Sequence, residues 1–174
     1  WDLVARARPP MDWLFRRLVL PMSLLPPLMI LLASGGVGER VFPEAGFGNW
    51  LIAAVLFFVA EHFSVPIMAT SIRQASMAKN GSSRLQDAYA VAAIAPVPLW
   101  LSSLAVVFGS AWFTVIVGLV ALGASAMLIR HGVDRLLGIH EQVEASEVAM
   151  QVTSFGVLTW LVLLSIAAGA VTML

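Results

Sequence analysis

Five long apolar runs divide this chain of 174 residues, and each run is able to cross a lipid bilayer as a helix, the first with help from its flanks. A membrane-spanning helix needs about 20 apolar residues, because the hydrocarbon core of a bilayer is about 30 Å thick. With 60% of its residues apolar and only 11% charged, the chain lacks the polar surface of a soluble domain. The sequence therefore predicts an all-α, polytopic transmembrane bundle in a single domain over residues 1–174. The predicted spans are about 18–33, 50–70, 88–108, 112–129 and 152–174.

Basic residues are distributed unevenly among the segments that join these runs. Nine of the ten Lys and Arg residues fall in segments that an odd number of spans places on one side of the membrane, and Arg40 is the exception. Short loops rich in Lys and Arg stay in the cytoplasm. We therefore expect an integral membrane protein with a cytoplasmic N-terminus and an external C-terminus, in the inner membrane if the host is a bacterium. A face for anionic lipid or for a partner is predicted at Arg16, Arg17, Arg73, Lys79, Arg84, Arg130 and Arg135.

Prolines interrupt three of the five runs. Pro21, Pro26 and Pro27 lie in the first run, Pro66 lies in the second, and Pro96 and Pro98 lie in the third. A proline inside a helix removes a backbone donor and leaves a carbonyl without its partner, so these helices are expected to be kinked. The kinks either shape a bundle or mark the broken helices of a transporter site.

Small residues recur along the fourth and fifth runs, in "GLVALGASA" and "SIAAGA". Small side chains allow the backbones of two membrane helices to approach closely. We expect helix packing, within the bundle or between copies of the chain, at Gly118, Gly123, Ser125, Ala167 and Gly169.

Glu61 is the carboxylate that falls deepest inside a predicted span, and His62 follows it. An ionised side chain at the centre of a bilayer costs about 2.5–3.5 kcal/mol on insertion scales, so Glu61 must be protonated, paired or next to water. Two interpretations remain open for this candidate intramembrane polar site. Glu61 either serves a proton or substrate path, or makes a structural hydrogen bond to backbone freed by a proline. Consecutive helical residues diverge by about 100°, so His62 is not expected to share a ligand with Glu61.

Most tryptophans lie near the predicted span ends, as is typical of side chains that anchor a helix at the membrane interface. We expect that role, rather than ligand stacking, for Trp13, Trp50, Trp100, Trp112 and Trp160.

No motif of an enzyme, a nucleotide-binding site or a nucleic-acid-binding face occurs in the sequence, and cysteine is absent. His140, Glu141, Glu144 and Glu147 lie together before the fifth run, but they provide too few ligands on one helix face for a closed metal site. We therefore expect a non-enzymatic protein without a metal ion, a cofactor or a nucleic-acid partner.

The stretch "DAYAVAAIAPVPLWL", followed by a hairpin and by "LIRHGVDRLLGIHEQVEASEVAMQVTSFGVL", resembles the bacterial branch of the Yip1 domain family. The likeness rests on Tyr89 ahead of Pro96 in the third run, and on the element from Gly132 to Leu136 after the fourth run. The early "WLFRRLVLPMSLLPPLMI" is similar to the first span of that family. The resemblance implies five spans and a cytoplasmic N-terminus. The Rab GTPase partners of eukaryotic members are not carried over to this chain, because the acidic "DLYGP" type element of those members is missing.

Three functions are compatible with these features. The first is a scaffold or accessory subunit that packs with itself or with a larger membrane complex. The second is a small transporter or channel subunit in which Glu61 faces a hydrated path. The third is a lipid-binding or membrane-shaping protein. Membrane lipids, other membrane subunits or further copies of the chain are the expected partners.

Overall fold

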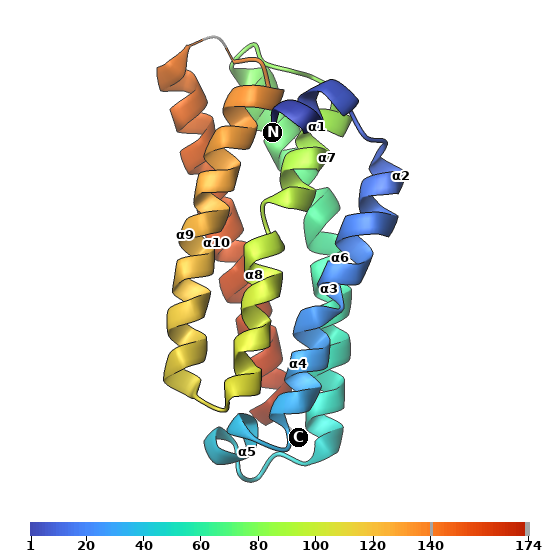
Figure 1. Cartoon of the computed structure of the whole chain (residues 1–174), viewed down its shortest axis with the longest axis vertical. Helices are drawn as coiled ribbons and strands as arrows, with labels where there is room; N and C mark the ends of the chain where they lie inside the picture. The colour runs from blue at the N-terminus through green and yellow to red at the C-terminus, as the bar shows by residue number, and fades with distance from the viewer. Residues whose placement is uncertain (140, 173–174) are drawn as a thin grey trace.

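The computed structural model describes residues 1–139 and 141–172, and every regular element in these two ranges is a helix (Figure 1). Five helical stretches are long and apolar enough to cross a membrane. They are Met11–Ala33, Phe47–Ala78, Leu85–Phe108, Ala111–Leu136 and Gln142–Thr172. The structure thereby confirms the predicted all-α bundle with five transmembrane-capable helices.

The first and third stretches consist of several consecutive elements, whereas the other three are continuous helices. In chain order the elements are α1 (Asp2–Ala7), α2 (Met11–Leu14), the π-helical η1 (Phe15–Val19), α3 (Leu20–Ser23), α4 (Leu25–Ala33), α5 (Val37–Val41), α6 (Phe47–Ala78), α7 (Leu85–Ile94), α8 (Val97–Ser102), the 3₁₀-helical η2 (Ser103–Phe108), α9 (Ala111–Leu136) and α10 (Gln142–Thr172).

Some of the prolines coincide with these interruptions, but not all of them do. The first stretch breaks at Leu24, just before Pro26, and the third breaks at Ala95 and Pro96. By contrast, Pro66 lies within the uninterrupted helix α6. Bending of the helix axes at these positions remains a prediction.

All five helical stretches extend beyond the apolar runs at one or both ends. Helix α6 continues eight residues past the predicted limit at residue 70, and α9 continues through Arg130 to Leu136. Helix α10 begins ten residues before the predicted start at residue 152. These extensions carry polar residues and lie toward the end of the bundle that holds α1, hereafter the α1 end (Figure 1). The opposite end, which holds α5, is called the α5 end.

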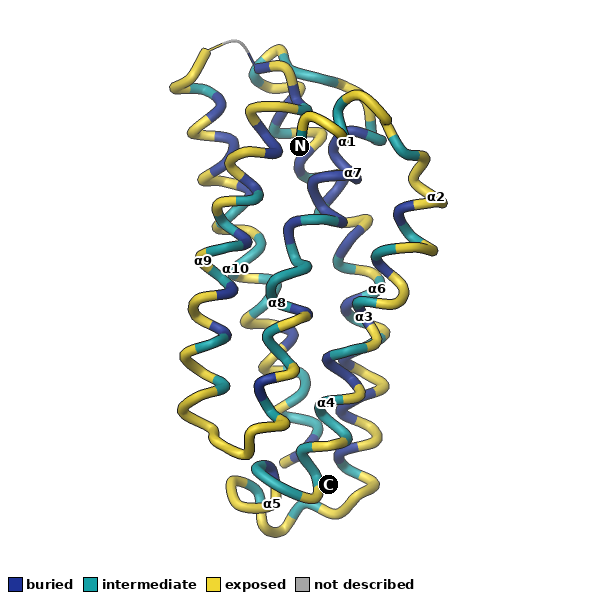
Figure 2. The backbone as a smooth tube through the Cα atoms, in the orientation of Figure 1, coloured by how far each residue is buried: buried dark blue, intermediate teal, exposed yellow. Residues whose placement is uncertain are grey.

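Helix α7 occupies the centre of the bundle near the α1 end. Every residue from Asp87 to Ala93 is buried, and Figure 2 shows α7 as the most continuously buried element. It packs against α6, α9, α2 and η1. Four alanines in this segment give α7 a thin profile, which suits a helix that is surrounded on all sides.

The central helix of the bundle, α7, ends at Ile94. Beyond Pro96 the chain continues as α8 and η2, which pack against α9, and η2 also packs against α4. Helix α4 packs against α6, α6 against α10, and α10 against α9, so the contacts form a closed ring (Figure 1). Towards the α5 end the bundle is therefore a ring of helices without a central helix.

The α8–η2 segment returns to α9 through a tight turn. Gly109 has φ 69°, a left-handed conformation that favours glycine, and Ser110 caps α9 by accepting a hydrogen bond from the Phe113 amide at 3.3 Å. The two antiparallel helices are therefore adjacent in the ring.

Candidate functional site

The ring of helices encloses a cavity of about 330 Å³. Its walls come from α4, α6, α7, α8, η2, α9 and α10, and most of the side chains that line it are apolar. The lining residues of α10 run from Val152 to Ala167, a separation of about 22 Å at 1.5 Å per residue. The cavity is therefore long and narrow, parallel to the helices, and continues to the α5 end.

Glu61 projects from α6 into this cavity and is only 4% exposed. The indole Nε1–H of Trp100, on α8, donates a hydrogen bond to Oε1 of Glu61. Trp100 is itself 3% exposed. The structural hydrogen bond considered for Glu61 thus exists, but its donor is a side chain and not a backbone group freed by a proline.

Three buried polar atoms on the cavity wall have no hydrogen-bond partner within the described part of the chain. They are Oε2 of Glu61, Oγ of Ser125 and Nε1 of Trp50. All three residues are less than 7% exposed. A buried polar group without a partner costs about 1–3 kcal/mol, so three of them along one cavity indicate a space that receives something able to hydrogen-bond.

The charge of the cavity wall is one-sided. Glu61 is the acidic residue of the lining, and among the described residues the lining contains no Lys, Arg or His. A buried carboxylate without a basic neighbour is uncommon, because buried charges in proteins are normally paired. The cavity therefore suits a donor or a cation at Glu61, and mainly apolar groups with a few hydrogen-bonding atoms elsewhere.

The wall of the cavity is thin at Leu164 on α10. This residue lines the cavity and is 42% exposed, so a single side chain lies between the cavity and the outer surface of the bundle there.

His62 lies on a different face of α6 from Glu61. Its ring contacts Phe15 of η1 edge-on at 5.2 Å between centroids, and Phe58 at 4.8 Å. His62 does not line the cavity. The two residues thus contact different neighbours, as the helical geometry predicts.

The small residues of α9 and α10 fall into two groups. Gly118, Ser125 and Ala167 line the cavity, whereas Gly123 is exposed on the outside of the bundle. A side chain added at Gly118, Gly123 or Gly169 would meet no atom within 4 Å. Within this chain these glycines are therefore not points of close helix approach, and packing against a second protein at Gly123 and Gly169 remains a prediction.

The residues behind the family resemblance are structural in this fold. Tyr89 is buried in α7, and Pro96 stands where α7 gives way to α8. A Cβ at Gly132 would lie 3.0 Å from the Trp1 ring and 3.1 Å from Val91, so glycine permits a close approach there. Leu136 packs against the main core cluster.

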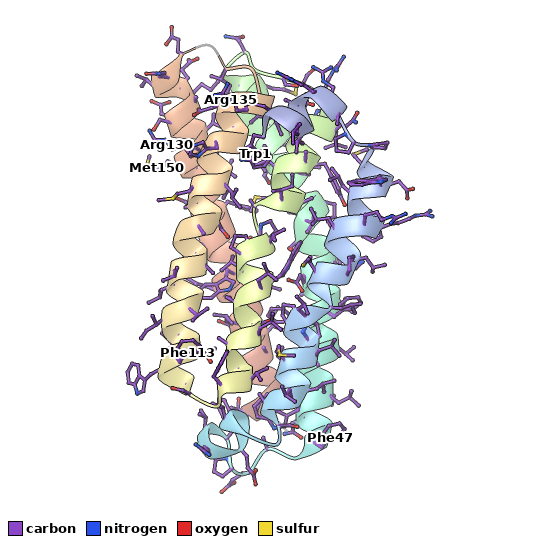
Figure 3. All side chains as sticks on the ribbon, viewed as in Figure 1. Trp1, Phe47, Phe113, Arg130, Arg135 and Met150 are labelled. Carbon is purple, nitrogen blue, oxygen red and sulfur yellow. The ribbon has the colours of Figure 1, made fainter. Side chains whose placement is uncertain are left out.

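The predicted basic face is partly neutralised by neighbouring acids. Arg16 pairs with Asp12 at 2.9 Å, and Arg135 approaches Asp2 at 3.7 Å. Figure 3 shows Arg130 and Arg135 toward the α1 end with Trp1, whereas Phe47 and Phe113 lie toward the α5 end. The described part of the chain gives no ion pair for Arg17, Arg73, Arg84 or Arg130.

Lys79 ties the end of α6 to the start of α10. Its ammonium lies 2.7 Å from Glu147 and 3.8 Å from Glu144. The hydrogen bond to Glu147 and the negative charge of that residue raise the pKa of Lys79 above its ordinary value, and Glu144 and Glu141 add smaller effects. Two of the acids before the fifth run therefore serve an ion pair between helices.

His140, the remaining member of that acidic segment, lies outside the described residues. No group of three His, Cys, Asp or Glu side chains suited to a metal ion occurs in the ranges that the structure describes.

Sequence reasoning missed the part that tryptophan plays in the site. Trp50 and Trp100 were expected at the membrane interface, but both are buried and line the cavity. That expectation was wrong for them because Trp100 lies on the cavity side of the helix ring, and Gly38 of α5 lies directly against the ring of Trp50. Trp112, at 80% exposure, and Trp13, at 53%, lie on the outer surface, and their role as interface anchors remains a prediction. The sequence shows that Trp100 lies two residues after Pro98. It does not show that Trp100 donates to Glu61, which lies 39 residues away.

Comparison with known proteins shows one relationship. Residues 1–166 match the family model of the Yip1 domain. No curated protein and no solved structure matches the chain.

Proposed function

The chain belongs to the Yip1 domain family of membrane proteins, and we propose that it is a non-enzymatic member which binds the apolar chain of a lipid-like molecule inside its helix bundle. The cavity in the helix ring carries this proposal. Ligand sites are usually concave, mostly apolar and furnished with a few polar groups, and the helix ring has these properties.

The shape and the wall of the cavity favour a chain over a compact solute. The space is elongated parallel to the helices, its wall is mainly apolar, and the single side chain of Leu164 lies between it and the outer surface of the bundle. A hydrated path for ions or solutes would require polar groups along its length, and apart from Glu61, scattered Ser and Thr hydroxyls and the tryptophan indoles the wall is apolar, which argues against one. We therefore favour lipid binding over the transporter or channel alternative.

A scaffold or accessory subunit is the second candidate, and the outer surface of α10 favours it. The apolar window of this helix is only 11% buried, the lowest share among the five spans. Ser165 is exposed and Gly169 follows one turn later on the same face, a spacing that suits a second helix. Crosslinking in native membranes through Ser165→Cys tests it, and a band of monomer alone counts against this function.

Native mass spectrometry of the protein released from its membrane tests the lipid-binding proposal. Gly118→Leu places a larger side chain in the cavity, and Gly123→Leu adds the same atoms on the outer face of α9. A Cβ added at either glycine would meet no atom within 4 Å, so both positions have room for the start of a side chain. We expect a retained apolar adduct on the unaltered protein and on Gly123→Leu, with a several-fold loss on Gly118→Leu.

Two results would contradict the proposal. One is a protein that carries no adduct under conditions that preserve annular lipid on other membrane proteins. The other is an adduct that Gly118→Leu and Gly123→Leu retain equally, which would place the bound molecule on the outer surface and support the scaffold candidate instead.

A further inference from the structure

Glu61 lines the cavity, and one of its two carboxyl oxygens has no hydrogen-bond partner within the described residues. Trp100 holds Oε1 and thereby fixes the orientation of the carboxyl group, while Oε2 is buried and has no partner in the part of the chain that the structure describes. No basic side chain among the described lining residues is available to pair with it. The site is thus incomplete, and the missing partner is a hydrogen-bond donor or a cation.

From this geometry we propose that the bound molecule is a single-chain amphiphile with an ammonium head, which donates to Oε2 of Glu61. The inference rests on the proposed function and adds the chemistry of the head group. An ammonium provides both the missing positive charge and the missing donor, and hydrogen bonds between charged groups are about twice as strong as those between neutral groups.

The cavity has room for an apolar chain on both sides of Glu61. Its lining along α6 runs from Glu61 to Ile72 toward the α1 end and from Glu61 to Trp50 toward the α5 end, about 16 Å each way at 1.5 Å per residue. A dodecyl chain fits the available length in either direction.

Head groups of the opposite charge are unfavourable in this cavity. A carboxylate or phosphate head at the same point would place a second negative charge next to Glu61, at low dielectric and without a cation to separate them. The structure thus predicts discrimination by charge among molecules that have the same chain.

Equilibrium binding of three probes with the same chain, dodecylamine, dodecanol and dodecanoate, tests the proposal. The protein is placed in lipid nanodiscs, and binding to empty nanodiscs is subtracted. We expect dodecylamine to bind about tenfold more tightly than dodecanol, equivalent to about 1.4 kcal/mol, and dodecanoate to bind most weakly.

Two carboxylate-to-amide substitutions make the test specific. Glu61→Gln retains an oxygen that accepts from Trp100 but removes the charge, so the preference for the amine should disappear while dodecanol still binds. Glu44→Gln removes an exposed carboxylate between α5 and α6, outside the cavity, and should leave the preference unchanged. If Glu61→Gln does not accumulate in the membrane, the three probes on the unaltered protein decide the matter alone.

The outcomes separate this inference from the proposed function. Equal binding of the three probes, or tighter binding of dodecanol or dodecanoate, overturns the ammonium assignment and leaves the apolar cavity intact. An amine preference that survives Glu61→Gln also overturns the assignment. No saturable binding of any probe contradicts the proposed function itself.

Discussion

Replacement of Trp100 by phenylalanine removes the hydrogen bond that orients Glu61 and leaves most of the aromatic ring in place. Trp100 is 3% exposed and its Nε1–H is the partner of Oε1 of Glu61. After the substitution both carboxyl oxygens are buried without a partner. We expect the bundle to lose stability and the cavity to lose its fixed acceptor.

The loss of stability in Trp100→Phe has two contributions. An orphaned buried acceptor costs about 1–3 kcal/mol, and more when it is charged. The smaller ring also leaves a void, which costs about 24 cal/mol per Å³. Trp160→Phe removes the same atoms from another cavity-lining tryptophan for which no hydrogen bond is described. Trp160 is only partly buried, so its cost is a lower limit for the second contribution. Trp100→Phe should therefore lose at least about 1 kcal/mol more than Trp160→Phe.

Equilibrium unfolding in mixed micelles measures this difference, and a double-mutant cycle locates it. Trp100→Phe, Glu61→Leu and the double variant should show a coupling energy of at least about 0.5 kcal/mol, since the two side chains share one hydrogen bond. Equal stabilities of Trp100→Phe and Trp160→Phe, or a coupling energy near zero, would refute the reasoning.

Three further predictions concern packing, charge and orientation. Gly132→Ala should destabilise the protein by about 1–3 kcal/mol, because its Cβ meets two side chains at about 3 Å. Gly118→Ala should be neutral or stabilising, because its Cβ meets no atom within 4 Å. Thermal unfolding compares the two variants, and equal effects on stability would contradict the close packing at Gly132. The ion pair raises the pKa of Lys79 in the folded state, so its stabilising contribution is present below pH 10.5, the ordinary pKa, and is lost as the pH rises through the raised value. The unfolding free energies of Lys79→Met and the unaltered protein should accordingly differ at neutral pH and converge as the pH rises through the raised pKa of Lys79, and a constant difference to the highest pH would exclude this explanation. Since the chain has no cysteine, Ser83→Cys and Glu44→Cys provide unique labels for membrane-impermeant reagents. We expect Ser83→Cys to be labelled only from the cytoplasmic side and Glu44→Cys only from outside, and the reverse pattern would refute the orientation inferred from charge.

The existence and order of the five spans follow from the sequence, because hydropathy over about 20 residues reports directly on the solvent that surrounds a helix. The positions of the helix ends cannot be predicted from hydropathy in the same way. Helix α9 continues through Arg130 to Leu136, and α10 starts at Gln142 among acidic residues. These turns are stabilised by packing and ion pairs at the α1 end, which an apolar run does not reveal.

Glu61 was identifiable from the sequence because a carboxylate in the middle of an apolar run is costly. Its partner was not, since Trp100 is brought to it only by the break at Pro96 and by the packing of α8 in the ring. The cavity is likewise a property of the assembled helices. Gly118 and Gly123 look alike in the sequence, yet one lines the cavity and the other faces outward.

A structure determined in lipid nanodiscs tests the central claim most directly, because it shows what fills the ring of helices. We predict continuous elongated density along the cavity, with its polar end within hydrogen-bonding distance of Oε2 of Glu61. A ring that has closed on itself, or a cavity that contains only ordered water around Glu61, would contradict it.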